Sequence, residues 1–200
     1  MNQLLNTFMD NLRIGEDQIL GRLTIKPIIN VEPDHARPMP LKTMDEAISQ
    51  DLLEITEINS GGSVPQLLVK NLGDQDILIL EGETVIGGKQ NRAVNSTFII
   101  PAGGEIVAPV SCVEAGRWRY ASDNFSSGGS VVYPSLRAES HKAVSRNLHA
   151  NQEYRSDQSG IWSDIASKGR RMDVASPTGA MADIERSAFT IRVSSPFPAR

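Results

Sequence analysis

The sequence holds a single cysteine, Cys112, so a disulfide within the chain is excluded. It also lacks an apolar run of 18 residues, which a membrane-spanning helix requires, and its N-terminus has no basic region followed by an apolar one. The formal net charge is −4 and the pI is near 5.4, which argues against a nucleic-acid or anionic-membrane surface built on bulk charge. These absences predict a cytoplasmic protein that has neither a membrane span nor nucleic acid as a partner.

Two kinds of catalytic motif are also missing. The three histidines lie in separate segments without metal-ligand spacing, so the sequence predicts no metal site. Gly82 and Gly87 have the spacing of a phosphate-binding loop, but Gly88 stands where that motif requires lysine, and no Ser or Thr follows Lys89 to hold magnesium. No residue pattern identifies a cofactor, which stays unknown.

Helices are predicted at both ends of the chain. Apolar residues recur on one helical face over residues 4–12, and again after Asp157. Residues 134–149 are weakly helical. Thr43 followed by Glu46 forms a capping box, which predicts a short helix that begins at this point.

The middle of the chain predicts β-sheet. Short apolar segments follow one another at roughly ten-residue spacing, and residues 77–80 form an uninterrupted apolar run expected to be covered on both faces. Pro109 lacks an N–H donor, so its strand should lie at an edge or bend there. Residues 121–130, rich in Ser and Gly, predict a mobile loop. The predicted strands cover residues 53–58, 67–70, 77–80, and a hairpin of 96–100 with 105–113. The fold class is therefore α+β, with a β-sandwich-like core at about 53–115 and helices packed around it.

Two polar clusters interrupt or end apolar stretches, at residues 87–92 and 111–118. They bring amide, cation, carboxylate, thiol and indole groups to strand ends, a mixture that a packed core does not need and a ligand site does. The candidate ligand-binding residues are Glu81, Glu83, Lys89, Gln90, Asn91, Arg92, Glu114, Arg117 and Trp118.

Each candidate has a structural alternative. The glycines before Lys89 form either a plain bulge or a bulge that turns the polar side chains towards a ligand. Cys112 and Arg117 enclose four residues, as in the anion cradles of sulfurtransferases and cysteine phosphatases, but Glu114 inside that loop would repel an anion, which favours an inert buried thiol. Glu81 and Glu83 alternate onto one face, where they could share acid–base chemistry or form a solvated strand end.

Several of these segments in combination resemble a known family. They are Leu-Glu-Gly-Glu at 80–83, Gly-Gly-Lys-Gln-Asn-Arg at 87–92, Ile-Pro-Ala-Gly at 100–103 and Pro-Val-Ser-Cys-Val-Glu-Ala-Gly-Arg-Trp at 109–118. Together they are similar to the ARG and rhodanese-phosphatase-superfamily-associated protein domain. The resemblance covers roughly residues 20–183. It implies genomic association with ADP-ribosylglycohydrolases and rhodanese-phosphatase proteins, and no assigned reaction.

The resemblance sets the domain organisation that we expect. Residues 1–184 form one family-like domain, and residues 185–200 form an atypical tail, disordered or truncated, because their apolar residues show no periodicity and two prolines come late.

Three functions remain open. The first is a ligand-binding or accessory domain in a nucleotide- or ADP-ribose-linked system, with a nucleotide-like small molecule as ligand. The second is an enzyme that uses Cys112 or the Glu81/Glu83 pair, with catalytic residues unknown. The third is a protein–protein module in which Arg117, Trp118 and Tyr120 are the hot spot, because these residue types dominate interface energies.

Overall fold

The chain divides into two compact units, Met1–Met39 and Pro40–Arg200. The computed structural model describes residues 2–31, 40–59, 65–151 and 153–194. The sequence also predicts an extended loop at 32–40, from its three prolines, and a turn at Asn-Ser-Gly-Gly 59–62; both fall mostly outside the described residues.

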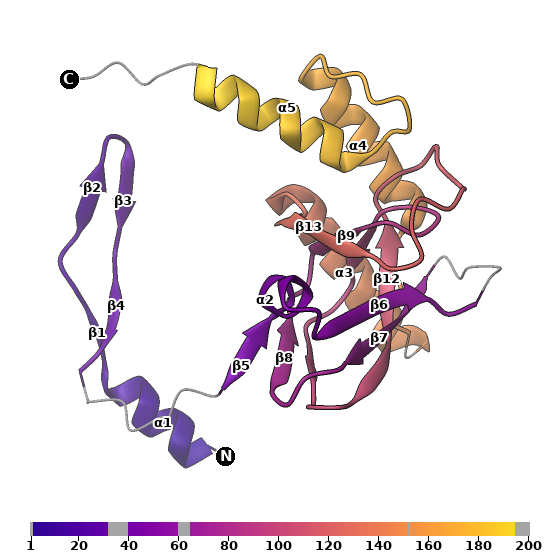
Figure 1. Cartoon of the computed structure of the whole chain (residues 1–200). Coiled ribbons are helices and arrows are strands. Elements are labelled where there is room, and N and C mark those ends of the chain that lie inside the picture. Colours follow the sequence, from indigo (N-terminus) through magenta and orange to yellow (C-terminus); the bar gives the residue numbers. More distant parts are fainter. Residues whose placement is uncertain (1, 32–39, 60–64, 152, 195–200) are drawn as a thin grey trace. The chain divides into compact units, whose positions relative to one another are not determined.

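The first unit is a helix followed by a long two-stranded ribbon (Figure 1). The helix α1 (Asn2–Asp10) agrees with the apolar spacing of its sequence. The ribbon turns at Gly21, whose φ of 62° is the left-handed conformation that a tight hairpin requires. Its strands are β1 (Leu12–Ile14), β2 (Gln18–Leu20), β3 (Leu23–Ile25) and β4 (Ile28–Asn30), with β1 paired to β4 and β2 to β3, both antiparallel.

The described residues of the second unit form two sheets. The larger is antiparallel, with strand order β13-β9-β10-β12-β7-β6, and the smaller has the order β11-β8-β5, with β5 parallel to β8. The strands are β5 (Leu41–Thr43), β6 (Leu53–Glu57), β7 (Gln66–Asn71), β8 (Asp76–Ile79), β9 (Glu83–Ile86), β10 (Arg92–Val94), β11 (Phe98–Ile100), β12 (Glu105–Cys112) and β13 (Ser126–Val131).

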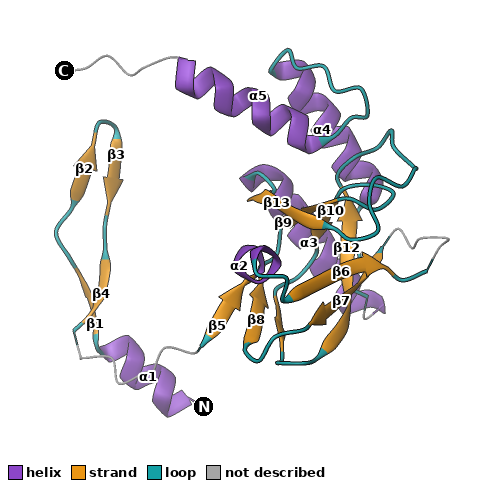
Figure 2. Ribbon diagram, viewed as in Figure 1, coloured by secondary structure: helices purple, strands orange, loops and turns teal. Residues whose placement is uncertain are grey.

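Among the residues of this unit that the structure describes, four helices accompany the sheets (Figure 2). They are α2 (Met44–Ser49), α3 (Pro134–Asn151), α4 (Gln158–Arg171) and α5 (Met181–Ser194). The predicted capping box is confirmed, because the Thr43 hydroxyl accepts from the Glu46 N–H and the Glu46 carboxylate accepts from the Thr43 N–H. Asp157 caps α4 in a similar way, by accepting from the Gly160 N–H.

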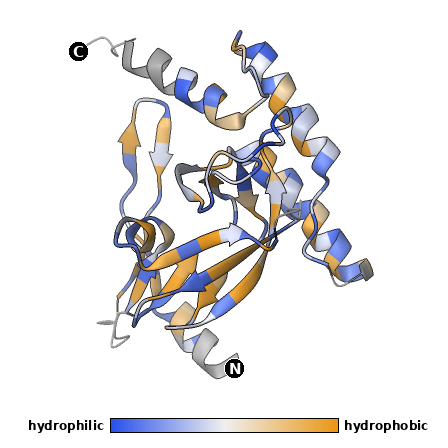
Figure 3. Ribbon diagram, turned by 45° about the vertical axis from the view of Figure 1, so that its right-hand side comes forward, coloured by the Kyte–Doolittle hydropathy of each residue, from blue (hydrophilic) through white to orange (hydrophobic). Residues whose placement is uncertain are grey.

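Both sheets and α2 contribute to one hydrophobic core, in which alternate residues of β6 and β7 are buried (Figure 3). A second cluster lies where α3, α4 and α5 meet β10 and the residues that directly follow β12 and β13. The α+β class is therefore confirmed, and the β-sandwich-like core is a curled, mostly antiparallel sheet that shares its interior with the smaller sheet. No helix among the described residues is long and apolar enough to cross a membrane.

The predicted hairpin of 96–100 with 105–113 is wrong, because β11 pairs with β8 and β12 pairs with β7 and β10. The buried Asn71 amide holds this corner, donating to the carbonyls of Gln75, Ile100 and Pro101 at 2.8 to 3.0 Å. Pro109 lies in an interior strand rather than at an edge, at the register position where pairing with β7 ends and pairing with β10 begins.

Two other segments differ from expectation. Part of the predicted 121–130 loop is strand β13, which can approach β9 because Gly128 has no side chain: a Cβ there would lie 2.1 Å from the Thr84 hydroxyl. The atypical tail expected from residue 185 is helical as far as Ser194, because α5 begins at the buried Met181 and continues past the buried Ile184. Residues 195–200 lie outside the described residues.

Candidate functional site

The two polar clusters are adjacent in the structure. Strand β10 pairs with β12, which places Arg92 opposite Cys112. Beyond the strands the contact continues, since the Val113 N–H donates to the Asn91 carbonyl at 3.0 Å and the Asn91 N–H donates to Glu114 Oε2 at 3.1 Å. The segments 87–92 and 111–118 therefore form one continuous structure at the end of β12.

Glu114 is the centre of this structure. Its Oε2 atom accepts from Arg117 Nε at 2.9 Å, and its Oε1 atom accepts from the Thr178 hydroxyl at 2.8 Å. Burial would raise the pKa of Glu114, but the hydrogen bonds from Arg117, Thr178 and the Asn91 N–H outweigh it and hold that pKa below its ordinary value. Glu114 is therefore an ionised carboxylate, and both of its oxygens accept hydrogen bonds from groups of the protein. It is not positioned to act as an acid or a base on a substrate.

The Arg117 guanidinium ties this loop to the glycine turn. Its Nη1 atom donates to the Gly88 carbonyl at 2.8 Å, and its Nη2 atom donates to the Gly87 carbonyl at 3.2 Å and to Asn91 Oδ1 at 3.0 Å. Gly88 has a φ of 48°, and a Cβ there would lie 2.3 Å from Phe125 Cζ. The two glycines therefore lie in the turn between the paired strands β9 and β10, where a side chain would not fit, rather than in a bulge.

Arg92 pairs with a residue that the sequence analysis missed. Its side chain is completely buried, and Nη2 lies 3.6 Å from Oε1 of Glu57, which is also buried. Nη1 donates to Gln90 Oε1 at 3.3 Å, while Arg92 Nε, Arg92 Nη2 and Glu57 Oε2 have no hydrogen-bond partner. The sequence does contain a pattern that could have identified Glu57. Along β6 it alternates in step with Leu53 and Ile55, so its side chain lies on the same buried face as theirs.

Gln90 is buried too, and its amide donates to the Glu114 carbonyl at 2.8 Å. The polar cluster at 90–92 is thus directed into the protein, where it supports the loop at 114–120. These side chains support the surface and do not present their polar ends to solvent.

Cys112 lies in an environment that disfavours the thiolate. It is fully buried, and burial raises its pKa to about 11, even though the nearby Arg92 acts in the opposite direction. Reactive cysteines are partly exposed and have lowered pKa values. The Cys112 thiol therefore behaves as a small apolar group.

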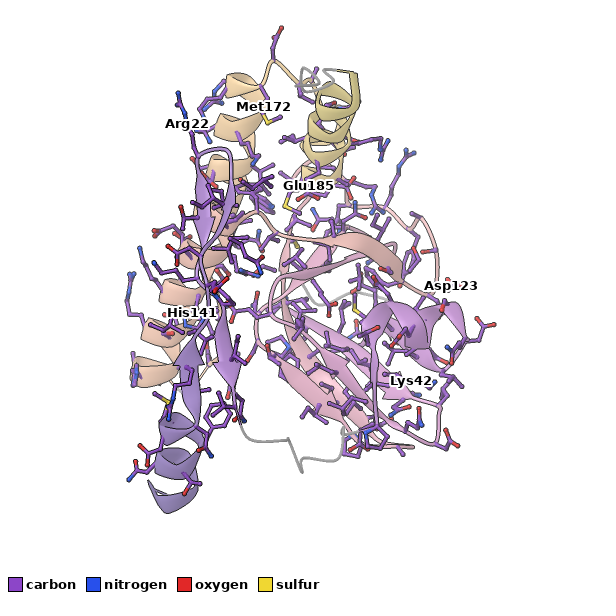
Figure 4. The ribbon with its side chains drawn as sticks, turned by 90° about the vertical axis from the view of Figure 1, so that its left-hand side faces the viewer. Arg22, Lys42, Asp123, His141, Met172 and Glu185 are labelled. Carbon is purple, nitrogen blue, oxygen red and sulfur yellow. The ribbon has the colours of Figure 1, made fainter. Side chains whose placement is uncertain are left out.

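Glu81 and Glu83 do not act as a pair. β9 begins at Glu83, so Glu81 lies in the preceding turn and the expected alternation does not apply. Glu83 accepts from the Leu80 N–H at 2.7 Å, and burial raises its pKa. The Glu81 carboxylate instead lies 3.0 Å from Nδ1 of His141, a residue of α3 that is labelled in Figure 4. Within the described part of the chain, no group of His, Cys, Asp and Glu residues could hold a metal ion.

The exposed part of the site is small and aromatic. Trp118 and Tyr120 are 50% and 48% exposed, and Lys89 Nζ lies 5.4 Å from the centroid of each ring. The loop that carries the rings is attached to the glycine turn, because the Ala121 N–H donates to the Gly88 carbonyl at 2.9 Å. Of the predicted site residues, Lys89 and Trp118 therefore reach the surface together, and Tyr120 joins them.

One of the comparisons with known proteins identifies a family. The model of the ARG and Rhodanese-Phosphatase-superfamily-associated Protein domain matches residues 11–194, so the chain belongs to that family. The match continues ten residues past the boundary at 184 that the sequence predicts. No curated protein and no solved structure matches the chain.

Proposed function

We propose that the chain is a ligand-binding or accessory domain whose contact surface is formed by Lys89, Trp118 and Tyr120. The observation that carries the proposal is the position of the Lys89 ammonium between two half-exposed aromatic rings. Aromatic faces stack on planar rings, and an ammonium group pairs with an anion. This combination suits a planar ligand with negative charge, such as a nucleotide.

The buried residues of the site would then act as its support. Arg117 links the Trp118 loop to the carbonyls of Gly87 and Gly88, and Glu114 holds the Arg117 guanidinium. A surface that is already fixed loses little conformational entropy when a ligand binds. On this view Gln90, Asn91, Arg92 and Glu114 position the contact residues and do not themselves touch the ligand.

The family supports one ligand class. Its description names an association with ARG. We take ARG to mean the ADP-ribosylglycohydrolases that the resemblance implies, and it is this interpretation that suggests ADP-ribose. ADP-ribose carries an adenine that could stack on Trp118 and phosphates that could pair with Lys89. Arg119 directly follows Trp118 and could provide a second positive charge for the phosphates. We therefore take ADP-ribose as the first ligand to test.

The test is a titration with ADP-ribose, followed by tryptophan fluorescence. Trp162→Phe removes the second tryptophan, so that the signal comes from Trp118 alone. We expect quenching that saturates, a loss of binding by calorimetry in Trp118→Ala, and at least about tenfold weaker binding in Lys89→Ala. Tyr154→Ala is the matched control, because Tyr154 is 45% exposed and not part of this surface. No saturation, or equal binding by all variants, would refute the proposal.

An enzymatic alternative rests on Glu81 and His141. Their contact lies beside a groove of about 560 Å³ that Arg137 and Lys142 also line. A carboxylate on Nδ1 orients the imidazole and leaves Nε2 able to transfer a proton. The alternative predicts slow hydrolysis of p-nitrophenyl acetate that Glu81→Gln and His141→Gln reduce together, whereas His149→Gln has no effect. Hydrolysis that all three variants retain would refute it.

A further inference from the structure

The Lys89 side chain covers aromatic faces that the proposed ligand would use. Its Nζ atom lies over the ring of Trp118 and over the ring of Tyr120, 5.4 Å from each centroid. A cation within about 6 Å of the face of an aromatic ring is attracted by the negative charge of that face. Solvent reaches both rings, which are half exposed, but the side of each ring that faces Lys89 is occupied by the ammonium group.

The backbone keeps Lys89 beside the two rings. The Gly88 carbonyl accepts from Arg117 Nη1 at 2.8 Å and from the Ala121 N–H at 2.9 Å. These two donors stand at the ends of the segment that carries both rings, and the acceptor belongs to the residue directly before Lys89. The Lys89 N–H is held as well, because it donates to Glu57 Oε1 at 3.2 Å. Lysine has a flexible four-carbon stem, so its ammonium can leave the rings while this backbone stays in place.

We infer that Lys89 selects the ligand by its charge: it keeps the ring faces closed to neutral planar molecules and opens them to anionic ones. The inference rests on the proposed function and adds a requirement for negative charge. A planar ligand and the ammonium cannot share one ring face, so a neutral ligand must displace Lys89 without a compensating contact. A phosphate instead draws the ammonium onto its own oxygens, and the base that accompanies the phosphate then stacks on the uncovered ring.

The size of this selection follows from the strength of the two contacts. A cation–π contact at an exposed site shifts an equilibrium about threefold, so two contacts favour covered rings over open rings by about tenfold. A ligand that binds only the open arrangement loses affinity by about the same factor. A phosphorylated ligand regains that factor, because its own contact with Lys89 replaces the two contacts that are broken.

The first measurement compares adenosine, which is neutral, with ADP-ribose by calorimetry on the full-length chain. In Lys89→Ala the dissociation constant of adenosine should fall about five- to tenfold, because the rings are open, while that of ADP-ribose rises at least about tenfold. Lys89→Arg keeps the cation and should keep the preference for ADP-ribose. Lys42→Ala is the matched control and should change neither constant, since Lys42 Nζ donates to Gln50 on β5 and α2, outside this surface. If Lys89→Ala weakens ADP-ribose but gives adenosine no gain in affinity, the inference is overturned and the proposed function stands.

Acrylamide quenching of Trp118 fluorescence tests the cover without ADP-ribose. In the Trp162→Phe background, Lys89→Ala should raise the quenching constant about 1.5-fold or more, because a covered ring face becomes accessible. Pyrophosphate should raise the constant in the chain that retains Lys89 and leave it unchanged in Lys89→Ala. Both results without any binding of ADP-ribose would refute that ligand and support the role of Lys89. A quenching constant that neither Lys89→Ala nor pyrophosphate changes would overturn the inference.

Discussion

Replacing Arg92 with methionine removes one partner of the completely buried Arg92–Glu57 pair. The two charges are 3.6 Å apart, and at an effective dielectric constant of about 20 their attraction is worth roughly 4–5 kcal/mol. Losing one partner of a buried pair costs about 3–5 kcal/mol, because the remaining charge has no compensation. We therefore expect Arg92→Met to lower the free energy of unfolding by about 3 kcal/mol or more, measured by urea denaturation with circular dichroism.

The double variant Arg92→Met, Glu57→Leu separates this explanation from a simple packing defect. Three polar atoms of the pair lack hydrogen bonds, so desolvation offsets most of its Coulombic attraction. We expect the double variant to lie within about 1.5 kcal/mol of the wild type, well above Arg92→Met alone. Lys142→Met, which breaks an exposed pair with Glu139, is the control and should change nothing measurable. Additive losses in the double variant would refute the reasoning.

Three further predictions concern the same site. Gly88→Ala should cost about 2–4 kcal/mol because its Cβ meets Phe125, whereas Gly103→Ala, also at positive φ but with open space around it, should cost about 1 kcal/mol; equal losses in urea denaturation would contradict this. Native Cys112 should react with iodoacetamide at pH 7.5 at least about a hundredfold more slowly than the urea-unfolded chain, and comparable rates would contradict its burial. Because the pKa of Glu114 is lowered on folding, its contribution to stability is present above the unfolded pKa of about 4.3 and is lost as the pH falls through the folded pKa. Glu114→Gln should therefore reduce the acid dependence of the urea midpoint between about pH 5 and pH 3, and an unchanged dependence would contradict the lowered pKa.

Local patterns in the sequence predicted where the helices and strands lie better than they predicted which strands pair. The capping box of Thr43 and Glu46 and the strand predicted at 53–58 depend only on neighbouring residues, and both are present in the structure, the strand as β6. The pairing of β11 with β8 depends instead on a corner that the Asn71 side chain holds by hydrogen bonds to residues 29 and 30 positions later. No local pattern contains that contact.

In the candidate site, too, the sequence predicts the position of the segments better than the contacts of their side chains. From the usual closeness of neighbouring strands, the sequence predicts that the two polar clusters meet. They do meet, although the contact comes from the pairing of β10 with β12 and not from the predicted hairpin. The direction in which their side chains point is a tertiary property. Gln90 and Arg92 turn inward because Glu57 of β6 and the Glu114 carbonyl provide buried partners for them. The exposed surface is consequently left to Lys89, Trp118 and Tyr120.

The attachment of the loop after β12 to residues near the C-terminus has a consequence for biosynthesis. Thr178 donates to Glu114, its carbonyl accepts from the Gly116 N–H, and the Met181 N–H donates to the Val113 carbonyl. These partners are more than 60 residues apart, so they can meet only after a ribosome has made almost the whole second unit. The strands can pair earlier. The loop that carries Trp118 is among the last parts of the nascent chain to reach its final conformation. A chain released early, before Thr178, would therefore retain most of its sheet and lack an ordered loop.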